Sequence, residues 1–143
     1  MGKMTLATAQ TIISAAFEKA DSLSLKPLTV VVMDAGGHVV ALARQDGSSI
    51  LRPQIASGKA YGALAIGTGT RWLHANAETR PHFVQALNGA SGGAIIPVPG
   101  GVLVRDLDGE VLGAVGVTGD SSDNDEACAT AGIAAVGFEA DCG

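Results

Sequence analysis

Four titratable side chains in this sequence have neighbours that suit acid–base chemistry. Asp34 ends a valine-rich run, Lys59 lies among small apolar residues, and Asp125-Glu126 opens a late helical stretch. A lysine in apolar surroundings has a lowered pKa and acts as a base or as an anchor for a ligand carboxylate. The alternatives are structural: an Asx turn at Asp34, a Lys59 ammonium that reaches solvent, and a helix cap at Asp125-Glu126. Residue types alone leave both interpretations open.

Two glycine-rich segments form a second group of candidates. Proline excludes regular strand at Pro99, so the N–H groups of Gly100 and Gly101 are free to hold an oxyanion. We expect these three residues to form one wall of a ligand pocket. Gly116 and Thr118, later in the chain, are expected to form the opposite wall. The structural alternative is a bulge at the two adjacent glycines.

Tyr61 and Arg44 complete the predicted ligand-binding set. Tyr61, the single tyrosine, either fills the core or offers its hydroxyl to a ligand or to iron. Arg44 lies near Asp46 at the end of a predicted hairpin, where it either contacts a ligand or forms a solvated pair with that carboxylate. In the ligand hypothesis, Lys59 holds an anionic ligand in a pocket closed by the glycine-rich wall.

Three histidines, His38, His74 and His82, are the candidates for binding iron or a divalent metal. None lies in a His-x-x-x-His pair or beside a cysteine, so the sequence contains no established metal motif. Cys128 and Cys142 fit no disulfide or metal framework, and we expect two free thiols, the second at a frayed chain end. A redox role for either thiol is left open.

Hydrophobic periodicity predicts the elements that position these residues. The clearest signal is a hairpin in which Asp108-Gly109 joins runs 102–106 and 110–118. The second run is apolar on both faces and contains small residues, which predicts a central strand approached closely by a helix, a ligand or another subunit. The other predicted elements are a helix over 5–21, strands over 28–34 and 38–44, a helix over 53–66, short helices over 72–78 (capped by Thr70) and 81–87, a strand over 94–97 and a helix over 123–137.

This order of elements predicts a single α/β domain over 1–143, with a five-stranded, mainly antiparallel sheet flanked by helices on both faces. Aromatic residues are only 3% of the chain, so small aliphatic side chains must build the core. A net charge of -5 without a basic cluster argues against a nucleic-acid partner. No apolar run is long enough to cross a membrane, and no secretory leader pattern is present, so we expect a cytoplasmic protein.

Five motifs, in this order along nearly the whole chain, resemble the GlcG/HbpS-like family of heme-binding and heme-degrading proteins. They are V-V-M-D-A-G-G-H-V-V-A-L-A-R-Q-D-G, G-K-A-Y-G-A, P-V-P-G-G-V-L-V, G-E-V-L-G-A-V-G-V-T-G and D-N-D-E. The same domain forms the C-terminal part of some PduO-type corrinoid adenosyltransferases. The resemblance implies a profilin-like α/β/α fold and an even-numbered homo-oligomer, an octamer or a smaller assembly.

Two main function classes follow, and a structural interaction module is a third. The first is an oligomeric protein that binds heme or another tetrapyrrole as its cofactor, with a histidine or Tyr61 as axial ligand. The alternative is a lyase, hydratase or isomerase acting on a small carboxylated or hydroxylated metabolite. In that enzyme Asp34, Lys59 and Asp125 or Glu126 would transfer protons.

Overall fold

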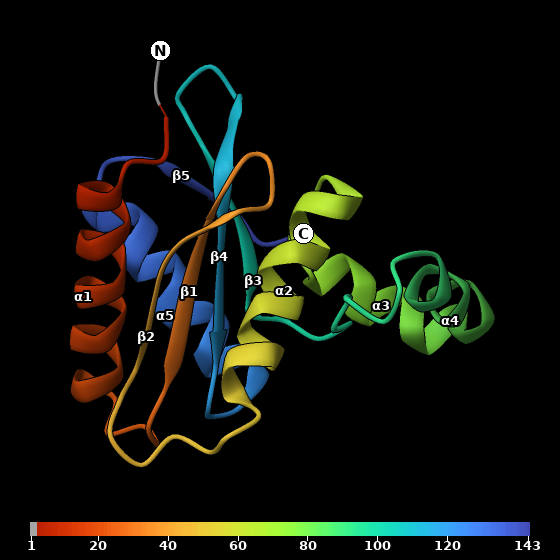
Figure 1. The fold of residues 1–143 in the computed structure, drawn as a ribbon, viewed down its shortest axis with the longest axis horizontal. Helices are drawn as coiled ribbons and strands as arrows, with labels where there is room; N and C mark the ends of the chain where they lie inside the picture. The colour runs from red at the N-terminus through yellow and green to blue at the C-terminus, as the bar shows by residue number, and fades with distance from the viewer. Residues whose placement is uncertain (1–2) are drawn as a thin grey trace.

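The computed structural model describes residues 3–143 and consists of a five-stranded sheet with helices on both faces (Figure 1). The strand order is β2-β1-β4-β3-β5, and all neighbouring strands are antiparallel. The predicted layered α/β fold is therefore confirmed. No helix among the described residues is long and apolar enough to cross a bilayer. The elements are α1 (Leu6–Ser22), β1 (Thr29–Asp34), β2 (Val39–Arg44), α2 (Arg52–Ile66), α3 (Arg71–Thr79), α4 (Pro81–Ala90), β3 (Gly101–Arg105), β4 (Val111–Thr118), α5 (Ser122–Ala135) and β5 (Glu139–Asp141).

β4 occupies the centre of the sheet, as its two apolar faces predicted. It pairs with β1 on one side and with β3 on the other. Gly116 of this strand packs so closely under α2 that a Cβ atom there would overlap the carbonyl group of Ala56. The small residues of β4 therefore admit a helix backbone directly against the strand.

Two apolar cores lie on opposite faces of the sheet. α1 and α5 cover one face, where Ile12 and Val115 are fully buried. α2 covers the other face, where Ala56, Ala60 and Val31 are fully buried. Aliphatic side chains of this size allow close spacing between helix and sheet, in agreement with the low aromatic content.

α3 and α4 extend from the end of α2 as an arm that points away from the sheet (Figure 1). Leu73 of α3 is fully buried, and Val84 is the buried residue of α4. The Arg80 guanidinium lies 4.2 Å from the ring centre of Phe83, so a cation–π contact supports the bend between the two helices. The arm is thus held to the body mainly through α3.

The predicted strand over 94–97 is wrong. This segment is irregular, and the N–H of Ile96 donates to the carbonyl of Gly58 on α2. Prolines at 97 and 99 have no N–H to give to a sheet, so the segment packs on a helix instead. The fifth strand is β5, which the sequence analysis placed in a frayed tail and which pairs with β3.

Thr70 does not cap α3 with its side chain, contrary to the prediction. Its hydroxyl donates to the carbonyl of Val98 at 2.7 Å and accepts the N–H of Gly101 at 2.9 Å. Thr70 therefore connects the start of α3 to the start of β3 and satisfies buried backbone groups that the irregular segment leaves free.

The C-terminal residues are ordered, which corrects the expected fraying at Cys142. Arg105 on β3 holds Asp141 of β5 at 2.9 Å, and the hydroxyl of Thr130 lies 3.4 Å from the Cys142 sulfur. Cys142 is half-buried and Cys128 is buried, and both are free thiols, as predicted. Burial raises the pKa of Cys128 to about 11, so this thiol stays protonated at neutral pH.

We expect Gly116→Ala to destabilise the protein, because the added methyl group overlaps the backbone of α2. Overpacking of this kind costs about 1–3 kcal/mol. The matched control is Gly89→Ala on α4, where a Cβ atom meets nothing within 4 Å. That change should leave stability unchanged or raise it by about 0.5–1 kcal/mol. Urea unfolding of both variants measures the difference, and equal midpoints would contradict the close packing of α2 on β4.

Candidate functional site

Lys59 on α2 and Asp125 on α5 form a buried ion pair at the end of β4. Lys59 Nζ lies 3.2 Å from Asp125 Oδ2 and donates to the carbonyl of Val117 at 2.9 Å. Both side chains are 2% exposed. The other carboxylate oxygen of Asp125 accepts the N–H of Asp120 at 2.9 Å. The pair therefore joins two helices that cover opposite faces of the sheet.

Gly100 and Gly101 leave the space through which Lys59 reaches Asp125. A Cβ atom at Gly100 would lie 2.9 Å from Lys59 Nζ, and one at Gly101 would overlap the Lys59 carbonyl. Gly100 also has a φ of +118°, which favours glycine. The structure brings Lys59 next to these two glycines, as predicted. However, the anion that the ammonium holds is Asp125 of the same chain, and the lysine side chain fills the space assigned to a ligand.

Burial opposes the charges of this pair. Desolvation lowers the pKa of Lys59, and the attraction of Asp125 only partly offsets this effect. Desolvation likewise raises the pKa of Asp125 against the attraction of Lys59. A buried ion pair adds little net stability compared with apolar side chains, but loss of one partner leaves an uncompensated buried charge. We therefore expect the pair to act mainly by fixing the relative placement of α2 and α5.

The other acid–base candidates lie elsewhere. Asp34 ends β1, and its Oδ1 accepts the N–H groups of Gly36 and His38, each at 3.0 Å. These bonds, above all the one from the His38 backbone, lower the pKa of Asp34 and make the Asx turn that was the structural alternative. Glu126 accepts three bonds from Arg71 of α3, at 3.0, 3.1 and 3.3 Å. The predicted acid–base residues therefore do not form one site.

The predicted wall residues lie inside the fold. Gly116 packs under α2, and the hydroxyl of Thr118 accepts a bond from Arg52 Nη1 at 2.7 Å. Pro99 is buried beside Gly100. None of these residues borders the apolar hollow described below, so the structure does not join them into its wall.

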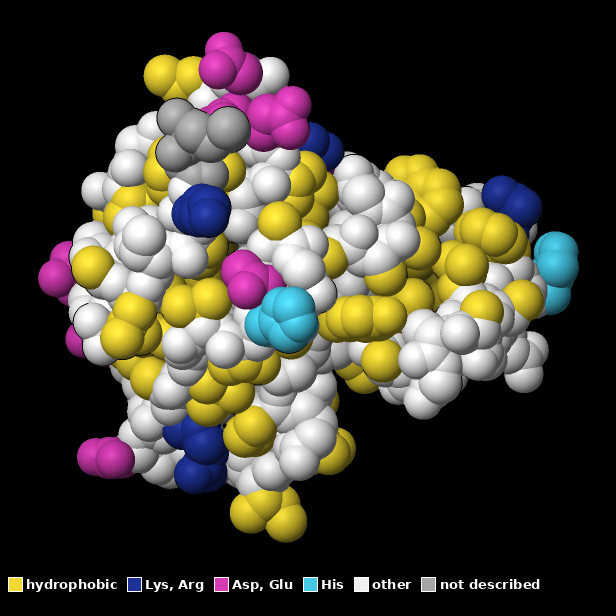
Figure 2. All heavy atoms as spheres, turned by 45° about the horizontal axis from the view of Figure 1, so that its top comes forward, with side chains coloured by type: hydrophobic (Ala, Val, Ile, Leu, Met, Phe, Trp, Pro, Cys, Tyr) yellow, Lys and Arg dark blue, Asp and Glu magenta, His cyan; other side chains and the backbone are white. Residues whose placement is uncertain are grey.

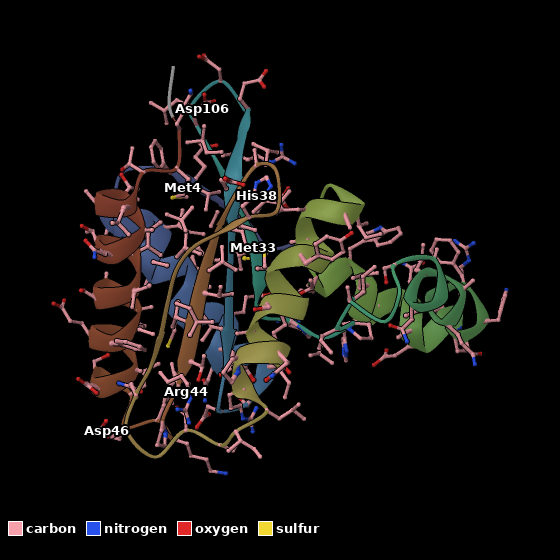
Figure 3. All side chains as sticks on the ribbon, in the orientation of Figure 1. Met4, Met33, His38, Arg44, Asp46 and Asp106 are labelled. Carbon is pink, nitrogen blue, oxygen red and sulfur yellow. The ribbon has the colours of Figure 1, made fainter. Side chains whose placement is uncertain are left out.

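Arg44 and Asp46 lie at the opposite end of the sheet from His38 (Figure 3). Arg44 Nη2 donates to the carbonyl of Ser48 at 2.6 Å, and it is this loop carbonyl, not Asp46, that holds the guanidinium. The two residues border an open, mainly polar hollow, which offers little apolar contact area for a cofactor.

Tyr61 borders a hollow of about 460 Å³ on the outer side of α2. Its exposed wall is predominantly apolar and contains no charged side chain. Hydrophobic side chains also gather where the arm meets the body of the molecule (Figure 2). Apolar walls with a few polar groups are typical of cofactor sites. This α2 hollow is lined by Met33, Leu51, Gln54, Ile55, Ser57, Gly58, Tyr61, Gly93, Ala94 and Ile96.

The β1–β2 turn brings Gly37, the residue before His38, beside the Tyr61 end of the α2 hollow. The Tyr61 ring is 3.8 Å from the position that a Cβ atom of Gly37 would occupy. Figure 3 shows His38 and Met33 toward the same end of the sheet. The Nδ1 atom of His38 lies 3.2 Å from Asp34 Oδ1, which leaves Nε2 free. A carboxylate on one ring nitrogen orients a histidine for metal binding through the other.

His74 and His82 do not border the α2 hollow. His74 on α3 pairs with Glu78 at 3.4 Å, and His82 lies in the first turn of α4 on the arm. Within residues 3–143, no three His, Cys, Asp or Glu side chains are grouped so that they hold a metal ion.

Tyr61 was predicted to bind a ligand, and it borders the α2 hollow, but the apolar wall around it was not predicted. The sequence predicted only that Met33 lies in a buried strand, and it placed Ile96 in a strand that does not form. One signal was present in the sequence. Leu51, Gly58 and Tyr61 recur at helical spacing on the side of α2 opposite its buried alanines, which is a pattern that a fully solvated helix face lacks.

Three comparisons with known proteins point in one direction. A family model described as "Haem degrading protein HbpS-like" matches residues 4–134. An uncharacterized 15.0 kDa protein from the dhaT-dhaS intergenic region of Citrobacter freundii is 30% identical over 122 residues, which cover 85% of this chain and 84% of that protein. The structure of a PduOC:heme complex matches with a TM-score of 0.85 at 25% identity, over 96% of this chain and 97% of the other. The structure of HbpS matches with a TM-score of 0.81 at 27% identity, over 96% and 92% of the two chains.

Removal of the Lys59 charge should destabilise the fold, because Asp125 would remain buried without its cation. We expect Lys59→Met to lose about 3–5 kcal/mol of unfolding free energy. The double variant Lys59→Met/Asp125→Asn should recover most of the loss, since an amide oxygen still accepts the Asp120 N–H. Lys26→Met, at an exposed lysine, serves as the control and should change stability by less than about 0.5 kcal/mol. Urea unfolding that gives Lys59→Met the stability of the wild type would contradict the role of the pair.

Proposed function

Because the chain belongs to the HbpS-like family, whose model matches residues 4–134, we propose that it binds heme in the α2 hollow. The observation that carries this proposal is the apolar wall of the hollow, with Tyr61 on its border. A porphyrin needs a large apolar contact surface, and this chain has few aromatic residues to provide one elsewhere. The heme in the PduOC:heme complex, a protein of the same fold, supports the same choice of ligand.

The residues around the hollow fit a heme in their donor chemistry. Tyrosine, histidine and methionine are all known axial ligands of heme iron. Tyr61 and Met33 line the hollow, and His38 follows Gly37, the residue that lies beside the Tyr61 ring. Asp34 would then be a positioning residue, because its carboxylate holds His38 Nδ1. The heme supplies the redox and gas-binding chemistry when bound, and the chain supplies the apolar wall and the ligand.

The wall offers no cation to the heme propionates. Its polar side chains are Gln54, Ser57 and the Tyr61 hydroxyl, and Lys59 points away toward Asp125. The propionates would therefore extend into solvent at the open side of the hollow, where they stay hydrated and need no buried partner. This arrangement replaces the earlier hypothesis that Lys59 anchors a propionate.

We further propose that the protein degrades the heme it binds, because the matching family model is described as a heme-degrading protein. Aerobic incubation of the heme complex with a reductant tests it. Loss of the Soret band together with iron release supports degradation, and a stable band contradicts it.

An acid–base enzyme is less well supported than a heme-binding protein. Asp34 pairs with Gly113 near one end of β4, whereas the Lys59–Asp125 pair lies near Val117 at the other end and is closed to solvent.

The proposal includes an even-numbered homo-oligomer. Two observations support it: Ile50 is 91% exposed beside Leu51, and the arm carries apolar side chains away from the body (Figure 2). Large exposed hydrophobic residues in contiguous patches mark association surfaces. Light scattering at micromolar concentration should give a multiple of the protomer mass, and a monomer mass would contradict association.

Hemin titration followed by absorption tests heme binding directly. We expect a Soret shift that saturates at a simple ratio to protomer. Tyr61→Phe or His38→Ala should alter the spectrum and weaken affinity about tenfold or more, equivalent to about 1.4 kcal/mol. His74→Ala and His82→Ala are matched controls outside the hollow and should behave as the wild type. A wild type without a saturable shift, or unchanged spectra in all four variants, would contradict the proposal.

A further inference from the structure

β2 is an edge strand whose outer side pairs with no other described strand. Natural proteins guard such edges with charges, short length or a covering segment, because free N–H and C=O groups there recruit another strand. The opposite edge is guarded in this way: β5 has only three residues, two of them acidic, and Asp141 is bound by Arg105. β2 carries no charge from Val39 to Ala43.

The ladder between β1 and β2 determines which backbone groups of β2 face outward. The N–H of Gln45 donates to the Leu28 carbonyl at 2.8 Å, so Gln45 faces β1. In an antiparallel pair the inward and outward residues alternate, and in β2 this alternation holds from Ala41 to Gln45, because the register with β1 shifts at Val40. Ala43 therefore also faces β1, where its partner is Val30, while the N–H and C=O groups of Leu42 and Arg44 point away from the sheet.

The surroundings of this edge are apolar and uncharged. Val39 is 54% exposed and Leu42 is 38% exposed. A hollow of about 470 Å³ separates β2 from α1, and the α1 residues that border it, among them Gln10 and Phe17, carry no charge. A second segment can approach this side of the molecule without meeting a like charge near the centre of the strand.

We propose that β2 pairs antiparallel with β2 of a second copy of this chain, about a twofold axis at Leu42. Leu42 then exchanges two backbone hydrogen bonds with the partner's Leu42, and Arg44 lies opposite the partner's Val40, where the register of β2 with β1 shifts. The two five-stranded sheets become one continuous sheet, and the hollows beside α1 meet across the axis. This pairing is independent of heme binding, and it would form one interface of the homo-oligomer proposed above.

A twofold axis at Leu42 keeps basic side chains farther apart than an axis one residue earlier or later. With the axis at Leu42, the two Arg44 residues are four positions apart along the seam, or about 14 Å, which exceeds the screening length of about 8 Å at physiological salt. An axis one residue later halves that separation. An axis one residue earlier places Arg44 opposite the partner's His38, a second basic group. Figure 3 shows His38 and Arg44 at opposite ends of β2, as this comparison requires.

Disulfide trapping tests the pairing. In a hydrogen-bonded antiparallel pair the Cα atoms are about 5.5 Å apart, which suits a disulfide. In a Cys142→Ser background, Leu42→Cys should therefore form a covalent dimer under mild oxidation. Val39→Cys is the matched control: Val39 is more exposed, but in the proposed register it faces the partner's Gln45. It should link at least tenfold more slowly.

A second variant tests the same interface without crosslinking. Leu42→Lys introduces the usual guard of an edge strand and should lower the particle mass by a factor of two or more, with the circular dichroism spectrum and hemin affinity unchanged. Equal linking of Val39→Cys, absence of the Leu42→Cys dimer, or an unchanged mass of Leu42→Lys would overturn the pairing. If the protein binds no heme, the crosslinking and mass results are still expected, because β2 lies outside the α2 hollow.

Discussion

The ion pair between Lys59 and Asp125 is the constraint on which the rest of the architecture depends. It is buried and joins α2 on one face of the sheet to α5 on the other. Its path requires Gly100 and Gly101, which bring β3 close to the helix backbone. Because α2 is fixed in this way on its inner side, its outer side is left to form a wall of the α2 hollow. The α2 hollow is that outer side, so the buried pair and the candidate heme site are two faces of one helix.

Much of the fold follows from the sequence. The hairpin at Asp108-Gly109, the central position of β4 and the helices on both faces were all predicted from turn chemistry and hydrophobic periodicity. The strand over 94–97 was wrong because tertiary packing of Ile96 against Gly58 overrode a short apolar run. β5 was missed because three residues with two carboxylates give no strand signal, and its position depends on pairing with β3 and on the contacts of Asp141 with Arg105 and Thr68, which no local pattern reveals.

The candidate site was less predictable than the fold. Lys59 was correctly singled out as a lysine in apolar surroundings, but its partner lies 66 positions later in the chain, and no spacing rule connects the two. The α2 hollow depends on Met33 from β1 and on the irregular segment near Ile96, so it exists only after the sheet and helix have packed. Residue types pointed to Tyr61 and His38 as candidate ligands, but spacing could not show that the β1–β2 turn places Gly37, next to His38, beside the Tyr61 ring.

Nuclear magnetic resonance of the isotope-labelled protein with ferric hemin tests the proposed heme site on the outer side of α2 most directly. Paramagnetic iron broadens the signals of nearby amides. We expect this broadening to centre on Gly58, Tyr61 and Gly93, with the amides near Arg44 and Asp46 unaffected. Broadening centred on the Arg44 end of the sheet, or spread evenly over the surface, would contradict the proposed site.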